Sequence, residues 1–349
     1  MKYRLLAAAL LAAGLLAAGE AAAQSRPFGQ EDSEVRTPRY QRAPQAAPRH
    51  AHHNHGHTNA HLHNDGRVHD HRGRHPEDRH FDHAHGIETE HLFGFVSGSD
   101  VHHRGALIGM IEIVARTNKR DGRYEAFGKK FELAYGVTDS LNAAFSLSAA
   151  RHRIAGVTGF DNVGNDLVFN GFGGEVRWNW LKRTTPGTVG VTLHLEPVVQ
   201  RYDELSGLRG RKYGSENKLI VDTELVKDRL FAGFNVQYEV ERVLENGETE
   251  WEQGSKPGFA FGRTGRVVEN LYVGFNVQYQ RAYQGLTFGV FTGEEVYLGP
   301  TLFTKVGDNG FLSLAWNRQV WGEEVGNAAR LDLANFERDL FRVRAGIHF

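Results

Sequence analysis

The sequence contains no cysteine and carries a formal net charge of only −1 over 349 residues. The lack of cysteine excludes disulfides and a lipid-anchor cysteine, so packing and backbone hydrogen bonds must hold the fold together. The near-neutral charge gives no overall positive field, and we expect no nucleic-acid partner. Beyond the first residues, no stretch is long and apolar enough to suggest a transmembrane helix.

Residues 1–23 have the features of a secretory signal peptide. Two basic residues are followed by an uninterrupted apolar and small-residue run over 5–18, and the sequence AAA at 21–23 offers a cleavage site. A retained membrane anchor is the alternative, but it would need about 20 apolar residues. This run is shorter and ends at Glu20. We therefore predict that residues 1–23 are a signal peptide for export.

Residues 24–90 differ in composition from the rest of the chain. They contain few large apolar side chains and are rich in glutamine, arginine, proline, alanine and, from residue 50 onward, histidine. Such a segment cannot bury enough apolar surface to offset the entropy of the chain. We predict a disordered N-terminal arm, followed by a folded domain over 91–349.

Thirteen of the nineteen histidines lie in this arm, many of them as H-x-H pairs. In a flexible chain, such pairs can gather three or four imidazoles around Zn²⁺, Cu²⁺ or Ni²⁺, without any obligatory cofactor. A solvated linker or a pH-responsive tether are the alternatives, because an unperturbed histidine titrates near pH ~6.5. The candidate ligands are His50, His52, His53, His55, His57, His61, His63, His69, His71, His75, His80, His83 and His85.

From residue 91 onward, apolar and polar residues alternate with a period of two, which indicates β-strands. The phrase GFNVQY occurs at 233–238 and again at 274–279, 41 residues later, as expected for a repeated hairpin unit. Twelve strands are predicted, at residues 106–117, 125–137, 141–152, 168–181, 189–201, 217–226, 230–241, 256–266, 271–281, 294–305, 311–320 and 338–349.

Short and long connections alternate between these strands. Residues 136–141 and 306–310 form short turns, whereas 154–166 and 320–337 are long loops. Short turns at one end and long loops at the other are typical of outer-membrane β-barrels. We therefore predict an all-β fold: an antiparallel transmembrane β-barrel of about 12 strands in the bacterial outer membrane. An even strand count places both chain ends, and so the disordered arm, in the periplasm.

The last strand also predicts how the barrel is assembled. It alternates apolar and polar residues and ends on an aromatic residue. This pattern resembles the C-terminal recognition strand of bacterial outer-membrane proteins, which the barrel assembly machinery reads as an added strand. Outer-membrane lipid and that machinery are therefore expected partners. The candidate signal residues are Phe341, Val343, Ala345, Ile347 and Phe349.

The inward face of the barrel is predicted to carry charges of both signs. Such charges can pair across strands and fill a narrow barrel. Barrels of about eight strands are filled by their own side chains and sixteen leave a channel, so twelve strands leave a pore open as one outcome. The candidate lumen residues are Glu112, Arg116, Lys130, Glu132, Glu175, Arg177, His194, Glu196, Asp222, Glu224, Glu239, Glu241, Lys305, Arg342 and Arg344.

Three classes of function fit a barrel of this kind: a pore, a structural barrel and an outer-membrane lipid hydrolase. Hydrolases of the last class use a histidine with a serine two residues further on, and no histidine of this barrel has that spacing. Ser148 and His152 share a face but stand about 13 Å apart, too far for a nucleophile and its base. We expect that the chain is not an enzyme. The favoured hypothesis is a passive pore associated with divalent metal ions through the arm, and the alternative is a porin or structural barrel with an incidental histidine-rich linker.

The segment EHLFGFVSGSDV at 90–101, followed by such a barrel, resembles a family of uncharacterised proteobacterial outer-membrane proteins. The resemblance covers about residues 90–349. It implies the fold and the location, and it implies no known substrate. The histidine-rich arm is not part of the family pattern.

Overall fold

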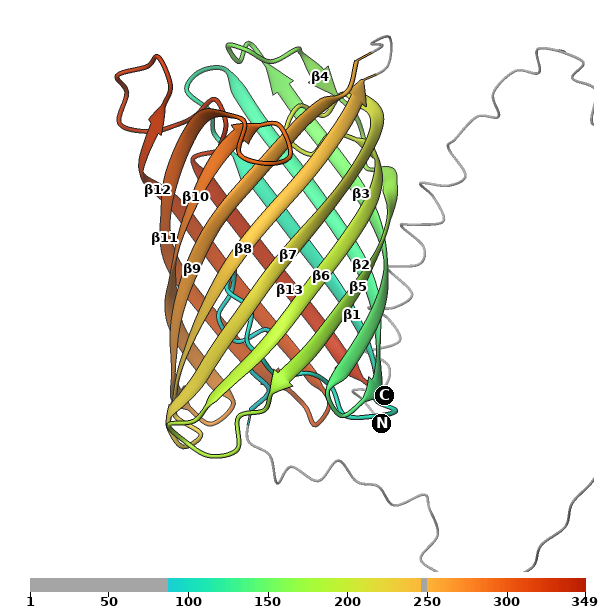
Figure 1. Cartoon of the computed structure of the whole chain (residues 1–349), viewed down its shortest axis with the longest axis vertical. Coiled ribbons are helices and arrows are strands. Elements are labelled where there is room, and N and C mark those ends of the chain that lie inside the picture. Colours follow the sequence, from blue (N-terminus) through green and yellow to red (C-terminus); the bar gives the residue numbers. More distant parts are fainter. Residues whose placement is uncertain (1–86, 246–249) are drawn as a thin grey trace, which may run out of the picture. The chain divides into compact units, whose positions relative to one another are not determined.

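The computed structural model describes residues 87–245 and 250–349. Their strands form one antiparallel sheet, and twelve of them close into a barrel (Figure 1). These are β1 (Leu107–Thr117), β2 (Arg123–Thr138), β3 (Leu141–Ala155), β5 (Val168–Leu181), β6 (Val189–Tyr202), β7 (Arg209–Val226), β8 (Leu230–Glu245), β9 (Glu252–Val268), β10 (Leu271–Gln284), β11 (Val290–Val306), β12 (Gly310–Glu324) and β13 (Asp339–His348). The predicted barrel of about twelve strands is confirmed.

The first and last strands close the ring. β1 pairs with β2 on one side and with β13 on the other, from Ile108 opposite His348 to Thr117 opposite Asp339. The short strand β4 (Val163–Gly164) lies outside the ring and pairs only with the end of β3. The closed ring satisfies the backbone donors and acceptors of every barrel strand, as a lipid environment requires. Among the described residues, no helix is long and apolar enough to cross a membrane.

Several strands extend further than predicted at the long-loop end. β7 begins at Arg209 instead of 217, and it pairs with β8 as far as Gly210 opposite Glu245. The extension of β7 over 209–216 is mostly polar, with Tyr213 as its one large apolar side chain, so no regular apolar alternation marks it as a strand. The predicted long loop over 202–216 is therefore mostly strand, and only 203–208 connects β6 to β7.

The outer surface carries an apolar belt. Phe145, Phe172 and Leu195 expose about half of their surface, at 54%, 50% and 51%. Trp178 and Trp180 are also exposed, next to the short turn that ends β5. Aromatic residues at the rim of an apolar band are the features that outer-membrane barrels present to lipid. The barrel is therefore of the type that spans the bacterial outer membrane.

A segment that precedes β1 lies inside the short-turn half of the barrel (Figure 1). This plug, residues 87–102, precedes β1 and begins four residues before the predicted domain boundary. Leu92, Phe93 and Val96 in it are fully buried. They belong to one cluster with inward-facing aromatic residues of the barrel wall, among them Phe231 and Phe311. Burial of these side chains stabilises the docked plug.

Two glycines of the barrel wall make room for the plug. A Cβ atom at Gly262 would lie 2.9 Å from the Cβ of Phe93, and one at Gly233 would lie 3.0 Å from its ring. Gly233 and Gly262 are opposite each other on β8 and β9. Together they form a recess in the wall into which the Phe93 ring fits.

Candidate functional site

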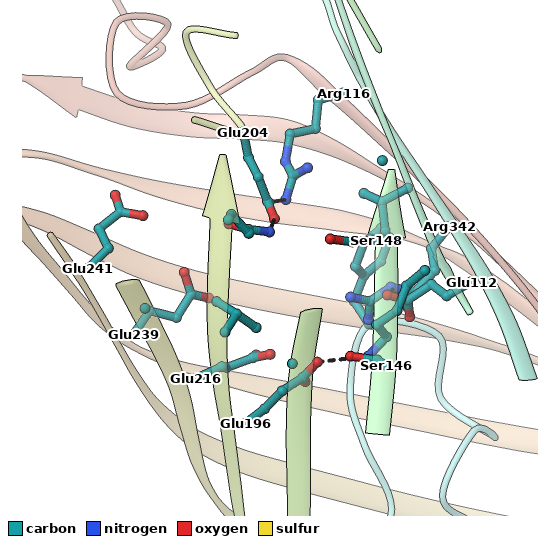
Figure 2. A pocket seen from close by; sticks show the side chains of 18 of the residues that line it. Glu112, Arg116, Ser146, Ser148, Glu196, Glu204, Glu216, Glu239, Glu241 and Arg342 are labelled. Carbon is teal, nitrogen blue, oxygen red and sulfur yellow. Dashed lines mark hydrogen bonds and ion pairs between the residues drawn. The ribbon is translucent and has the colours of Figure 1, made fainter. Parts of the chain in front are cut away.

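A polar cavity of about 320 Å³ lies in the lumen between the plug and the long-loop end. His91 and Phe95 of the plug line it at one end, and Leu205 and Glu337 from two long loops line it at the other. Inward-facing side chains of the strands line its walls (Figure 2). The middle of the barrel is therefore hollow, and segments that precede β1 or connect strands lie at both of its ends.

One wall of the cavity is acidic. Glu196, Glu216 and Glu239 occupy directly opposed positions on β6, β7 and β8. Like charges in opposed positions destabilise a sheet unless cations lie between them. Here Lys130 approaches Glu196 to 2.8 Å and Lys218 pairs with Glu216. The row of carboxylates is thus compensated in part and still presents oxygen atoms to the cavity (Figure 2).

The opposite wall carries an excess of positive charge. Arg342 and Arg344 of β13 both pair with the single carboxylate of Glu112 on β1, with Arg342 at 3.4 Å. In the ring order of the strands, this seam lies opposite β7 and β8. An acidic wall facing a basic wall produces an electric field across the lumen.

Two long loops close the outer end of the cavity. This lid consists of residues 203–208 and 332–338. Arg116 of β1 joins the two loops, because its guanidinium lies 3.1 Å from Glu204 and 3.2 Å from Glu337. Burial alone would raise the pKa of Glu204, but Arg116 and Lys212 lower it to about 2. Glu204 is therefore ionised at any physiological pH and the ion pair persists.

Further contacts fix the lid to the connection between β1 and β2 and to β3. Lys119 donates hydrogen bonds to the carbonyl oxygens of Ala334 and Phe336, at 3.1 and 2.7 Å. Burial lowers the pKa of Lys119 to about 8. The His152 ring is 3.1 Å from the Glu204 carbonyl oxygen, so this side chain positions the lid.

The plug is anchored at the opposite end by one aspartate. Asp222 of β7 is fully buried and accepts hydrogen bonds from Ser99 N at 2.9 Å, from Ser99 Oγ at 2.6 Å and from the Thr89 hydroxyl. Arg183 lies 2.7 Å from Asp222 and 2.7 Å from Asp100, so its guanidinium joins the wall to the plug. These are charge-assisted bonds, which are stronger than those between neutral groups.

The structure brings most of the predicted lumen residues together. The residues that line the cavity are Glu112, Arg116, Lys130, Glu132, Glu175, Arg177, His194, Glu196, Glu239, Glu241, Arg342 and Arg344. Asp222 faces inward but contacts the plug instead. Glu224 accepts a hydrogen bond from Asp228 N in the β7–β8 turn, and Lys305 lies at the short-turn end of β11. These three residues lie outside the cavity because the plug fills that half of the lumen.

Several charged residues of the cavity were not predicted. Lys212, Glu216 and Lys218 belong to β7, in or beside the segment taken for a loop. They lie an even number of residues before Asp222, so on a continuous strand they share its inner face. This spacing could have identified them as lumen residues. Glu204 and Glu337 are in loops, and no sequence periodicity marks a loop that folds inward. The thirteen histidines from His50 to His85 lie outside the described residues.

Comparison with known proteins supports the fold. Residues 85–349 match the model of a family described as a family of unknown function, DUF6662. Among solved structures, the chain is similar to the COG4313 outer membrane channel from Pseudomonas putida F1, with 11% identity and a TM-score of 0.50, over 72% of this chain and 98% of that chain. No curated protein matches.

Two other barrels match less well. The NanC porin shares 9% identity with a TM-score of 0.39, over 68% of this chain and 98% of its own. The β domain of the Bordetella autotransporter Brka shares 12% identity with a TM-score of 0.44, over 70% of this chain and all of its own. At such identities these likenesses concern the fold and not the transported solute.

Proposed function

The chain belongs to the DUF6662 family of unknown function, and from this premise we propose that it forms a gated outer-membrane channel for small polar solutes. One observation carries the proposal: the lumen is hollow and polar in its middle, and the plug and the lid lie at its two ends. A purely structural barrel of this width would fill its lumen with strand side chains throughout. Plug and lid contact the wall through hydrogen bonds and ion pairs that can break without unpairing any strand.

The proposal also covers divalent metal ions as a solute class, held near the periplasmic mouth by the histidine-rich arm. What supports this extension is the composition of the arm, because imidazole suits Zn²⁺, Cu²⁺ and Ni²⁺. A tethered set of ligands raises the local concentration of the ion at the mouth. The second candidate is a porin or structural barrel whose arm is an incidental linker.

The proposal includes no catalysis. His152, the histidine nearest in sequence to a serine on its own face, bonds to the Glu204 carbonyl oxygen and supports the lid. The acidic and basic side chains of the cavity pair with one another across strands. These contacts explain the polar lumen without a reaction.

In planar bilayers, the full-length protein is expected to show infrequent openings with a weak preference for cations. Eleven acidic and nine basic side chains line the cavity, so the charges nearly balance. Glu216→Gln should reduce the preference, which reversal potentials in a salt gradient measure. Glu269→Gln, in a short turn outside the cavity, is the matched control. If neither the correctly folded protein nor an Asp222→Ala variant, in which the plug loses its anchor, conducts ions, the structural barrel is favoured.

The arm is expected to bind metal by itself. Imidazole binds a metal ion only when neutral, so protons compete with the ion. A peptide spanning His50 to His85 should bind Zn²⁺ or Cu²⁺ at about pH 7.5 and release it as the pH falls through about 6. Calorimetric titration should show several overlapping sites. A peptide with every histidine replaced by asparagine is the control, and equal binding by both peptides would remove the metal part of the proposal.

A further inference from the structure

Three potential metal ligands converge at the periplasmic mouth, apart from the arm and from the cavity. Glu88 and His102 belong to the plug, and His348 is the last residue of β13. The Glu88 carboxylate lies 3.7 Å from Nδ1 of His102 and 3.6 Å from Nε2 of His348. One ligand atom of each residue lies within 4.8 Å of the other two.

The His102 ring is oriented as a metal ligand would be. Its side chain is only 4% exposed, yet its Nδ1 atom has no hydrogen-bond partner among the described residues. Its other nitrogen, Nε2, lies 3.3 Å from the Glu90 carboxylate. A buried nitrogen without a partner is costly. A carboxylate on the far nitrogen is the usual way in which a metal-binding imidazole is held in orientation.

We propose that Glu88, His102 and His348 form a binding site for a divalent metal ion, with Zn²⁺ as the best fit. Two imidazoles and one carboxylate are a ligand set that zinc uses, and its tetrahedral geometry separates ligand atoms by about 3.4 Å. The observed 3.6 and 3.7 Å are close to that spacing. Glu88 is 47% exposed, so an ion can reach the site from solvent and a water molecule can complete the tetrahedron.

A second cluster of potential metal ligands, in the cavity, already has a lysine beside it. Glu175, His194 and Glu196 also bring ligand atoms within 4.8 Å of one another. The ammonium group of Lys130 lies 2.8 Å from Glu196 and 3.0 Å from Glu132, so a cation already occupies this position. At the mouth site, His102 pairs with Glu88 and Glu90, and His348 pairs with Glu88. Arg177 lies 3.6 Å from the Glu90 carboxylate, which is the carboxylate next to Nε2 of His102.

One consequence follows from where the ligands lie. Because two ligands come from the plug and one from β13, a bound ion cross-links the plug to the barrel wall. In the sequence, Glu88 follows His85, the last histidine of the arm, by three residues. The metal site itself is independent of channel activity; its role in holding the channel closed rests on the function proposed above.

The test is the thermal unfolding of the full-length refolded protein with zinc and with a chelator. A ligand stabilises a protein when it binds the folded state in preference to the unfolded one. The composition of the arm predicts that it offers its histidines in both states, so we expect its zinc to contribute little to this difference. Saturating zinc is expected to raise the transition temperature of the wild type by about 5 °C. Glu88→Gln, His102→Asn and His348→Asn should each abolish the increase.

His103→Asn is the matched control, since it removes a neighbouring histidine that is not one of the three ligands, and it should keep the increase. Glu88→Gln replaces one atom of an exposed side chain, so loss of folding does not confuse its result. Anomalous scattering at the zinc edge from crystals of the full chain should place the ion between the three residues. An equal increase in wild type and variants, or none in the wild type, would overturn the site. Bilayer recordings in chelator test the channel separately.

Discussion

Asp222→Ala is expected to increase the ratio of open to closed channels in bilayers by about a hundredfold. Asp222 supplies the acceptor oxygens for Ser99 and Thr89 of the plug and binds Arg183, which also holds Asp100. Removing a buried charged acceptor weakens the docking of the plug by about 3 kcal/mol, because its donors lose their partner. The plug then leaves the short-turn half of the lumen more often.

Single-channel recording measures this effect directly. Asp308→Ala is the matched control, since it removes an exposed aspartate from a short turn at the same end of the barrel. It should leave the opening frequency unchanged. The variant must also be shown to fold. A folded barrel migrates differently in detergent gel electrophoresis before and after boiling. If the folded Asp222→Ala protein opens as rarely as the wild type, the plug is not the gate.

Deleting Phe349 is expected to lower the amount of assembled barrel in cells by about tenfold or more. Phe349 donates its backbone N–H to the Leu107 carbonyl oxygen at 2.9 Å, at the end of the seam between β1 and β13. Its ring is 54% exposed and continues the outward apolar row of Phe341, Val343, Ala345 and Ile347. Phe349→Tyr keeps both the aromatic ring and the backbone bond, so it should assemble almost normally.

Refolding in detergent distinguishes a loss of barrel stability from a loss of recognition by the assembly machinery. The seam has ten residue pairs, and deleting Phe349 removes none of them. Refolding of the purified chain should therefore be affected much less than assembly in cells, where the machinery must recognise the strand. Equal assembly in cells of the wild type, the deletion and Phe349→Tyr would contradict the predicted assembly signal.

The barrel could be predicted because each of its strands is marked by a pattern within its own short stretch of sequence. Each strand within the lipid alternates apolar and polar residues, and the alternation fixes which side chains face the lumen. Glu112, Lys130 and Glu196 could thus be assigned to the inner face without knowledge of their partners. The extension of β7 over 209–216 was missed because it is mostly polar and Tyr213 alone does not make an apolar alternation.

The plug and the lid could not be predicted, because their course depends on contacts with residues that are distant in the sequence. The segment around Phe93 has no periodicity, and its partners Gly233 and Gly262 are small residues on distant strands. The sequence does not distinguish a glycine that leaves space for an aromatic ring from a glycine that allows the strand to bend. The inward course of the lid depends on Arg116 reaching Glu204 and Glu337, which are far apart in the chain.

The plug has a further consequence for biogenesis. Its hydrogen bonds span long sequence separations: 133 residues from Thr89 to Asp222 and 222 residues from His91 to Ser313. Contacts of such high contact order form late, after most of the chain has been synthesised and paired. A truncated or stalled chain that lacks β12 also lacks Phe311, which belongs to one cluster with Leu92 and Phe93. We expect the apolar side chains of its plug to be more exposed to chaperones and proteases. We therefore expect docking of the plug to follow closure of the ring, and chains with an undocked plug to be degraded more readily.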